Sequence, residues 1–185
     1  MANNFNWLTV HECAYKKEIM INFDVDMINK VLIFCLLLVM ASCSNEGHYV
    51  PSFHLTTLKG QQISETDLRG KITIINVWAT WCPNCLSEIS ELNKLAEIYK
   101  TDTCVVFLAV SDETPEKIKI FLERKAFDFV HIPMGKILTS GLQTRMVKTY
   151  PQQIVLGKDL KIAFEHSGEL TNASAILDKE IRRLK

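Results

Sequence analysis

The most constraining feature of this sequence is a short apolar segment that runs directly into a pair of cysteines. Residues 72–78 are Ile-Thr-Ile-Ile-Asn-Val-Trp, a composition typical of a strand that is covered on both faces of a sheet. Cys82 and Cys85 follow, and Pro83 between them suits the first position of a helix, where no N–H donor is needed. A helix N-terminus stabilises a thiolate, because its free N–H groups and its dipole favour negative charge. The pattern therefore indicates reversible disulfide chemistry.

Length and charge exclude several other classes of protein. The 185 residues suffice for one domain of ordinary size, and a hydrophobic fraction of 48% is consistent with a packed core. The 21 basic residues are balanced by 21 acidic residues. Neither a nucleic-acid partner nor a polybasic membrane patch is therefore predicted.

The N-terminal part of the chain has the features of an export signal. Residues 31–41 form an uncharged apolar run that is shorter than the roughly 20 residues of a transmembrane helix. Lys30 supplies a positive flank, and the segment Met40-Ala41-Ser42-Cys43 resembles a bacterial lipobox, in which the cysteine is acylated. A plain secretory signal and a short membrane anchor with an unmodified Cys43 are the alternatives.

These features divide the chain into four segments. Residues 1–26 carry scattered charges that do not suit a signal peptide, and we interpret them as an upstream extension wrongly included ahead of an initiator at Met27. Residues 27–42 are then the lipoprotein signal peptide and residues 43–50 a polar tether. Residues 51–185 are expected to form the folded domain.

The remaining segments alternate between strand and helix patterns. The expected elements are a strand pair in 53–63, a turn or short helix in 64–70, a strand at 72–78, a helix from Pro83 to Tyr99, a strand at 104–111, a helix beginning at Pro115, a short strand at 129–132, a helix at 137–147, strands at 153–156 and 160–165, and a helix at 171–184. The short Gly157-Lys158-Asp159 connection makes the last two strands an antiparallel hairpin. This order predicts an α/β domain with a mixed sheet and helices on both faces.

The motif from Trp78 to Cys85, the later Tyr150-Pro151 and the order of elements resemble the thioredoxin superfamily. The most similar group is that of the membrane-tethered TlpA/ResA-like thiol–disulfide oxidoreductases, and the resemblance covers residues 50–185. It implies a thioredoxin-like mixed β-sheet flanked by helices on both faces, with an extra N-terminal strand pair.

The resemblance also implies roles for the site residues. Cys82 would attack as the thiolate, and Cys85, expected to be more buried, would resolve the mixed disulfide. Asn76 replaces the buried Asp of cytosolic thioredoxins, and Glu88 completes a Cys-X-X-Cys-X-X-Glu pattern in which the glutamate assists proton transfer. The alternative for Glu88 is a solvated helix carboxylate. Ser90 departs from the group, which often has a proline there.

Four further residues are assigned to substrate binding by the same resemblance. Pro151 would follow a cis peptide bond and, with Tyr150, would present backbone to an extended partner peptide. Trp81 would add apolar surface beside the cysteines. Pro83, between the cysteines, would also tune their reduction potential.

No metal or cofactor is expected. His48, His54, His131 and His166 are scattered singly along the sequence, whereas a zinc site would need two further ligands at matching spacing. The electrons of a dithiol reside on sulfur, so that chemistry requires no bound cofactor. Cys104 begins an apolar run and is expected to be a buried core residue, with a resolving thiol as the alternative.

The favoured function is that of an exported, lipid-anchored thiol–disulfide oxidoreductase that acts on cysteine-containing envelope proteins. The family implies a membrane thiol-relay protein as electron donor and a reducing role in cytochrome c maturation, on the periplasmic face of a bacterial membrane. The protein is expected to be a monomer, and the sequence leaves open which membrane holds it. A peroxiredoxin-like thiol peroxidase and a non-catalytic binding module are the alternatives.

Overall fold

The computed structural model describes residues 30, 50, 52–135 and 149–185. Except for Lys30, these residues lie in a compact unit that extends from Gly47 to Lys185. The proposed signal segment, the lipidation site Cys43 and the expected helix at 137–147 lie outside the described residues. Among the residues described, no helix combines the length and the apolar character needed to cross a membrane.

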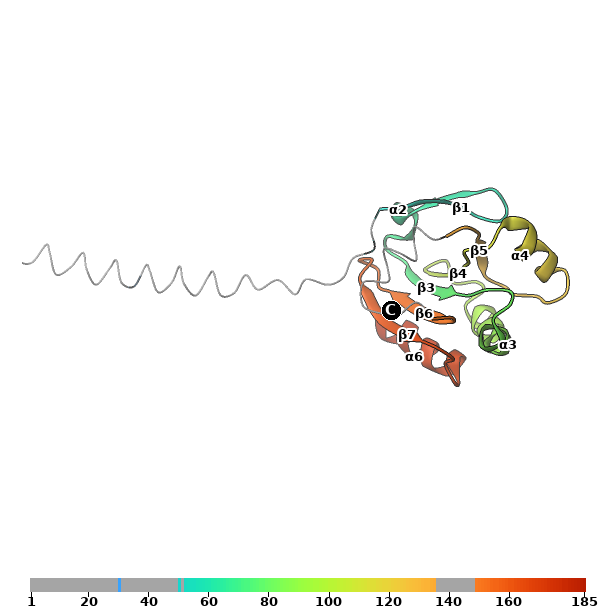
Figure 1. The fold of residues 1–185 in the computed structure, drawn as a ribbon. Helices are drawn as coiled ribbons and strands as arrows, with labels where there is room; N and C mark the ends of the chain where they lie inside the picture. The colour runs from blue at the N-terminus through green and yellow to red at the C-terminus, as the bar shows by residue number, and fades with distance from the viewer. Residues whose placement is uncertain (1–29, 31–49, 51, 136–148) are drawn as a thin grey trace, which may run out of the picture. The chain divides into compact units, whose positions relative to one another are not determined.

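The described elements follow the predicted order. They are β1 (His54–Thr56), β2 (Gln62–Ser64), α2 (Glu65–Leu68), β3 (Ile72–Val77), α3 (Pro83–Ile98), β4 (Val105–Val110), α4 (Pro115–Leu122), β5 (Val130–Ile132), β6 (Gln152–Leu156), β7 (Ile162–Ser167) and α6 (Ala173–Leu184). The larger sheet has the strand order β5-β4-β3-β6-β7, and β1 pairs with β2 in a separate two-stranded sheet (Figure 1).

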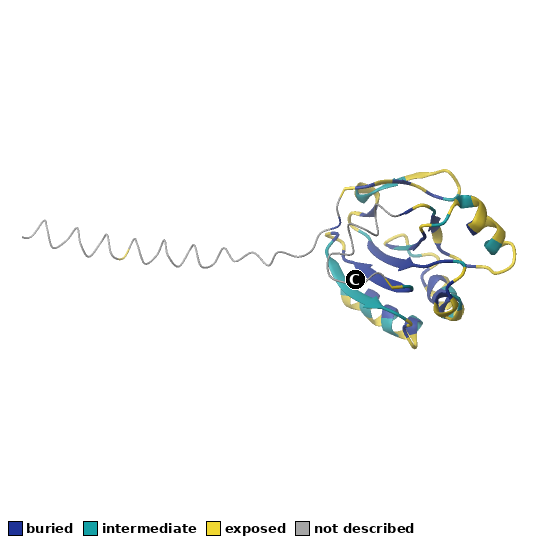
Figure 2. Ribbon diagram, viewed as in Figure 1, coloured by how far each residue is buried: buried dark blue, intermediate teal, exposed yellow. Residues whose placement is uncertain are grey.

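Strand β3 lies in the middle of the larger sheet. It pairs in parallel with β4 and antiparallel with β6. All six residues of β3 are buried, as are the five of β6, whereas the outer strand β7 is half-buried along its length (Figure 2). The β6–β7 pair is the predicted antiparallel hairpin. The sheet is therefore mixed, as expected.

The two faces of the sheet bury separate apolar clusters, because successive side chains of a strand point to opposite faces. Ile72 and Ile74 of β3 join the cluster formed with α3 and α6, whereas Ile75 and Val77 join the cluster on the other face. Leu68 of α2 and residues of the N-terminal segment belong to the second cluster. Figure 1 shows α3 and α6 on one side of the sheet and β1 with α2 on the other.

The prediction for Cys104 was wrong. Strand β4 begins one residue later, at Val105, and Cys104 is an exposed free thiol. Its N–H donates to Oδ1 of Asp102 at 2.9 Å, so the residue belongs to the polar turn that precedes the strand. The apolar run in the sequence begins at Cys104, one residue before the first buried residue of β4.

At the other boundary, Val50 is buried and its N–H donates to the carbonyl oxygen of Leu160 at 3.4 Å. The last residue of the proposed tether thus contacts the domain.

We expect Leu92→Ala to lower the free energy of unfolding by about 2–5 kcal/mol, because a fully buried leucine of α3 would leave a cavity against the sheet and α6. Ile98→Ala on the same helix is the matched control. Its side chain is 60% exposed, so a change within about 0.5 kcal/mol is expected. Chemical denaturation of both variants checks this, and equal losses would contradict the packing described.

Candidate active site

The two cysteines lie where the central strand turns into a helix. Cys82 is the N-cap residue of α3 and Pro83 is the first helical residue. Cys82 and Cys85 form a disulfide, with their Cα atoms 5.3 Å apart. The N–H of Cys85 donates to Sγ of Cys82 at 3.2 Å. The sulfur of Cys82 therefore occupies the place of a capping acceptor, where the helix stabilises negative charge.

The expected difference in depth between the two cysteines is absent from this oxidised form. Cys82 is 4% exposed and Cys85 is 3% exposed. The disulfide and the capping hydrogen bond both draw the sulfur of Cys82 toward the helix, which accounts for its burial. The first turn of α3 contains no acidic side chain that would oppose a thiolate.

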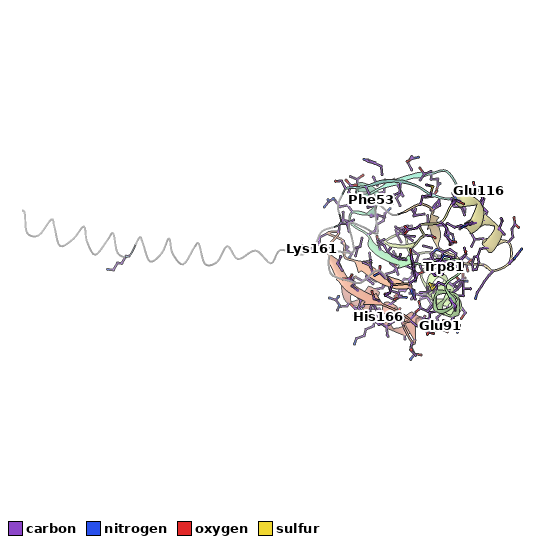
Figure 3. All side chains as sticks on the ribbon, viewed as in Figure 1. Phe53, Trp81, Glu91, Glu116, Lys161 and His166 are labelled. Carbon is purple, nitrogen blue, oxygen red and sulfur yellow. A yellow bond between two sulfur atoms is a disulfide. The ribbon has the colours of Figure 1, made fainter. Side chains whose placement is uncertain are left out.

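Two aromatic side chains flank the disulfide on its exposed side. Trp81, immediately before Cys82, is 66% exposed and is labelled near the start of α3 in Figure 3. Its ring meets the ring of Tyr150 edge-on, with centroids 5.6 Å apart. The peptide bond between Tyr150 and Pro151 is cis, as predicted, and Pro151 begins the approach to β6. The pair of rings thus forms an apolar platform that includes the residue directly before Cys82.

The other tryptophan of the motif belongs to the core. Trp78 is fully buried and contacts the rings of Phe121, Phe127 and His131. Pro83 is exposed at the start of α3. Of the residues assigned to substrate binding, Trp81, Pro83 and Tyr150 therefore have accessible surface, whereas Pro151 is buried.

Glu88 is not the solvated helix carboxylate of the alternative interpretation. It is 4% exposed and lies one helical turn beyond Cys85. One carboxylate oxygen accepts the side-chain amide N–H of Gln153 on β6, and the other accepts the backbone N–H of Leu170 before α6. Burial raises the pKa of Glu88 to about 7, an effect that these two hydrogen bonds partly offset and that the nearby charge of Glu169 reinforces.

Gln153 is a site residue that the sequence analysis missed. It is fully buried and lies opposite Asn76 in the β3–β6 register. Oε1 of Gln153 and Nδ2 of Asn76 find no hydrogen-bond partner among the described residues. Buried polar side chains of Asn76, Glu88 and Gln153 therefore lie beneath the cysteine-bearing helix, in a largely apolar cluster. The one feature of the sequence that could have pointed to Gln153 is its position two residues after Pro151, in the strand that follows.

The histidines that the structure describes are not gathered into a metal site. Within the described ranges, no group of three or more His, Cys, Asp or Glu side chains is placed to hold a metal ion. His131 is buried, which lowers the pKa of its imidazole, and its Nε2 lies 2.9 Å from the carbonyl oxygen of Phe127.

A cavity of about 790 Å³ lies beside His131 and is lined by aromatic residues that include Tyr99 and Phe107. Neither disulfide cysteine lines this cavity.

The raised pKa of Glu88 makes stability depend on pH. Between the ordinary carboxyl pKa of 4.5 and the folded value of about 7, the folded chain keeps a proton that the unfolded chain has lost. The free energy of unfolding should therefore fall, by on the order of 3 kcal/mol, as pH rises through this range. Glu88→Gln should remove that slope, and Glu91→Gln should retain it. Denaturation of the oxidised proteins between pH 4.5 and 7.5 tests this, and equal slopes in all three would contradict it.

Comparison with known proteins identifies relatives with the same chemistry in their names. A family model described as the AhpC/TSA family matches residues 47–165. The thiol-disulfide oxidoreductase ResA of Bacillus cereus is 32% identical over 126 residues, which cover 68% of this chain and 71% of the relative. The thiol:disulfide interchange protein DsbE of Pseudomonas fluorescens is 50% identical over 52 residues, which cover 28% of this chain and 29% of the relative.

Solved structures share the fold. A thiol:disulfide interchange protein of the thioredoxin family from Chlorobium tepidum matches with a TM-score of 0.66 and 20% identity, covering 77% of this chain and 99% of that one. A thiol-disulfide oxidoreductase from Bacteroides fragilis matches with a TM-score of 0.59 and 20% identity, covering 71% and 98%. By sequence and fold together, this chain belongs to the AhpC/TSA family and is one of its thioredoxin-fold thiol–disulfide oxidoreductases.

Proposed function

We propose that this protein reduces or exchanges disulfides in exported, cysteine-containing proteins through Cys82 and Cys85. The observation that carries the proposal is the disulfide between these two residues at the N-terminus of α3. A disulfide in this position ties a helix to its own first turn and adds no link between distant parts of the chain. Its chemistry, rather than its contribution to stability, is therefore the better reason for its presence.

The reaction begins with the reduced protein. The thiolate of Cys82 attacks one sulfur of the substrate disulfide, and the other substrate sulfur leaves as a thiolate. The thiolate of Cys85 then attacks Sγ of Cys82 and breaks the mixed disulfide, which releases the second substrate sulfur. Two electrons pass to the substrate, the two thiol protons accompany them, and the disulfide between Cys82 and Cys85 forms again. A donor dithiol reverses these steps to restore the reduced protein.

The helix assigns the two sulfurs to different roles. The N–H of Cys85 donates to Sγ of Cys82, and a thiolate there would accept the same hydrogen bond more strongly because it carries charge. Cys82 is therefore the residue better suited to attack. Cys85 lies within the first turn of the helix and is suited to resolving the intermediate.

Glu88 is suited to handle the proton of the resolving thiol. Resolution requires Cys85 to lose its proton, and a carboxyl group with a pKa of about 7 can take up and return protons near neutral pH. The contacts with Gln153 and Leu170 fix the carboxylate from β6 and from the segment before α6. We therefore assign Glu88 as the general base of the resolving step.

The aromatic platform is the proposed docking surface. Trp81 and Tyr150 offer apolar surface, and the cis peptide bond follows directly after Tyr150. A disulfide-bearing segment in extended conformation could lie across this platform with its sulfur next to Cys82. Such a surface accepts many sequences, because the contacts to the substrate are apolar or made to backbone.

The proposed setting is the periplasmic face of a bacterial membrane. The lipobox-like segment ending at Cys43 supports a lipid anchor, and residues 43–50 would keep the domain close to the bilayer. In this setting a membrane thiol-relay protein would supply electrons, and the cysteines that await haem attachment in cytochrome c maturation are the proposed substrates. The reduction potential of the Cys82–Cys85 pair would decide the direction of electron transfer. A potential of about −270 mV favours a reductant, and one of about −120 mV favours an oxidant.

The roles of the two cysteines predict different products. Cys85→Ser should accumulate a mixed disulfide between Cys82 and a substrate protein, because nothing resolves it, whereas Cys82→Ser should form none. Non-reducing electrophoresis and mass spectrometry of each reduced variant, mixed with a disulfide-containing protein such as insulin, check this. Trapping through Cys85 in the Cys82→Ser variant would reverse the assignment, and trapping in neither would argue for a non-catalytic module.

The proton role of Glu88 predicts a kinetic defect. Glu88→Gln should slow turnover at pH 7 by roughly 100-fold, the lower end of what general acid–base catalysis contributes, and should remove the pH dependence near 7 from the resolving step. Glu91→Gln is the matched control, since Glu91 lies one turn further along α3 and pairs with Lys94 (Figure 3). Stopped-flow measurement of mixed-disulfide decay tests both, and an unchanged decay rate in Glu88→Gln would dismiss the role.

A thiol peroxidase is the second candidate, favoured by the AhpC/TSA description of the family model. That chemistry is associated with a Pro-X-X-X-Thr-X-X-Cys context, which the residues before Cys82 do not provide. Hydrogen peroxide consumption by the reduced protein, at a rate exceeding that of its disulfide exchange, would favour this candidate.

A further inference from the structure

We infer that Glu113 is a positioning residue for the segment that carries the attacking cysteine. Glu113 lies in the turn between β4 and α4, 33 residues after Thr80. Its Oε2 accepts the backbone N–H of Thr80 at 2.7 Å, and its Oε1 accepts the hydroxyl of Thr80 at 2.8 Å. Both carboxylate oxygens thus contact Thr80, two positions before Cys82, and Oε2 also accepts the hydroxyl of Ser111 at 3.4 Å.

Such a pair of hydrogen bonds restrains orientation as well as distance. A hydrogen bond to a carboxylate is stronger than one to a neutral acceptor. Two such bonds, one to each carboxylate oxygen, also fix the orientation of the residue that donates them. Thr80 lies in the turn that Cys82 closes by donating its N–H to the carbonyl oxygen of Ala79 at 3.2 Å. Holding Thr80 therefore holds the turn that aims Sγ of Cys82.

Glu113 is itself anchored in the fold. Its N–H donates to the hydroxyl of Ser111 at 3.2 Å, and its carbonyl oxygen accepts the N–H of Met134 at 3.1 Å. Ser111 is fully buried, and its N–H donates to the carbonyl oxygen of Ile132 on β5 at 3.0 Å. The carboxylate thus connects the reactive turn to the ends of β4 and β5 rather than to a freely moving loop.

Asp112, the residue before Glu113 in the same turn, binds Tyr150 of the proposed docking surface. The hydroxyl of Tyr150 donates to Oδ2 of Asp112 at 3.1 Å, and Tyr150 in turn contacts Trp81. Two adjacent carboxylates therefore restrain the two segments that meet at the Trp81–Tyr150 ring contact, Glu113 the cysteine turn and Asp112 the residue before the cis proline. Asp112 is exposed, whereas Glu113 is half-buried, and so the Glu113 contact is the better protected from water.

This inference rests on the proposed dithiol function, and a double-mutant cycle tests it. Thr80→Val removes the hydroxyl donor. Glu113→Ala removes both acceptor oxygens. Each change should slow the reaction of the reduced full-length protein with glutathione disulfide by about tenfold, which the loss of a hydrogen bond to a charged group allows. The double variant should be no slower than the slower single variant, because both changes remove the same contact.

Two controls separate positioning from a general loss of structure. Thr80→Ser keeps the hydroxyl and should react at the wild-type rate. Glu116→Ala, which removes an exposed carboxylate on α4, should also leave the rate unchanged (Figure 3). The helical content and the denaturation midpoint of every variant are measured alongside, and the rate defects should persist where these match wild type.

Each contrary outcome has a definite meaning. Multiplicative rate defects in the double variant, or wild-type rates in both single variants, would overturn the positioning role. If Glu113→Ala does not fold, the comparison of Thr80→Val with Thr80→Ser decides, and equal rates for these two would overturn the positioning role. Wild-type protein that fails to reduce glutathione disulfide would instead refute the proposed function.

Discussion

The structure depends on the burial of one strand. β3 is covered on both faces and hydrogen-bonded on both sides, so its end has a single position relative to the sheet. α3 begins a few residues later and packs back on the same sheet, which forces a tight turn between them. The disulfide forms at this turn. A thiol at that point faces the N-terminal end of a long helix, and the core that fixes the helix also fixes the electrostatic environment of the sulfur.

The buried carboxyl group of Glu88 adds a polar contact to this arrangement beneath α3. Glu88 extends from α3 into a largely apolar cluster, and β6 supplies Gln153 as its partner. A buried carboxyl group costs stability once it is ionised, and the hydrogen bonds from Gln153 and Leu170 recover only part of that cost. A purely structural core would gain from an apolar residue at this position. The retained carboxyl group is therefore consistent with a chemical role beside the cysteines.

Local patterns in the sequence were sufficient for the order of the described elements and for the place of the cysteine pair at the start of a helix. The β-branched segment before Cys82, the proline at the helix start and the short connection between β6 and β7 each act over a few residues, and each prediction agrees with the structure. Cys104 was misplaced because an apolar run does not show where the helices stop covering a strand. Gln153 and Glu113 were missed for another reason. They contact residues 65 and 33 positions away, and no local period records such pairs.

The outer edge of β5 illustrates how the fold limits the ways a partner can dock. β5 is the last strand on its side of the sheet, and an open strand edge invites a foreign strand to pair with it. Here the N–H of Leu58, in the connection between β1 and β2, donates to the carbonyl oxygen of His131 at 2.8 Å. The connection between β1 and β2 therefore covers part of that edge. An extended polypeptide could lengthen the sheet at this point of β5 only by first displacing this connection.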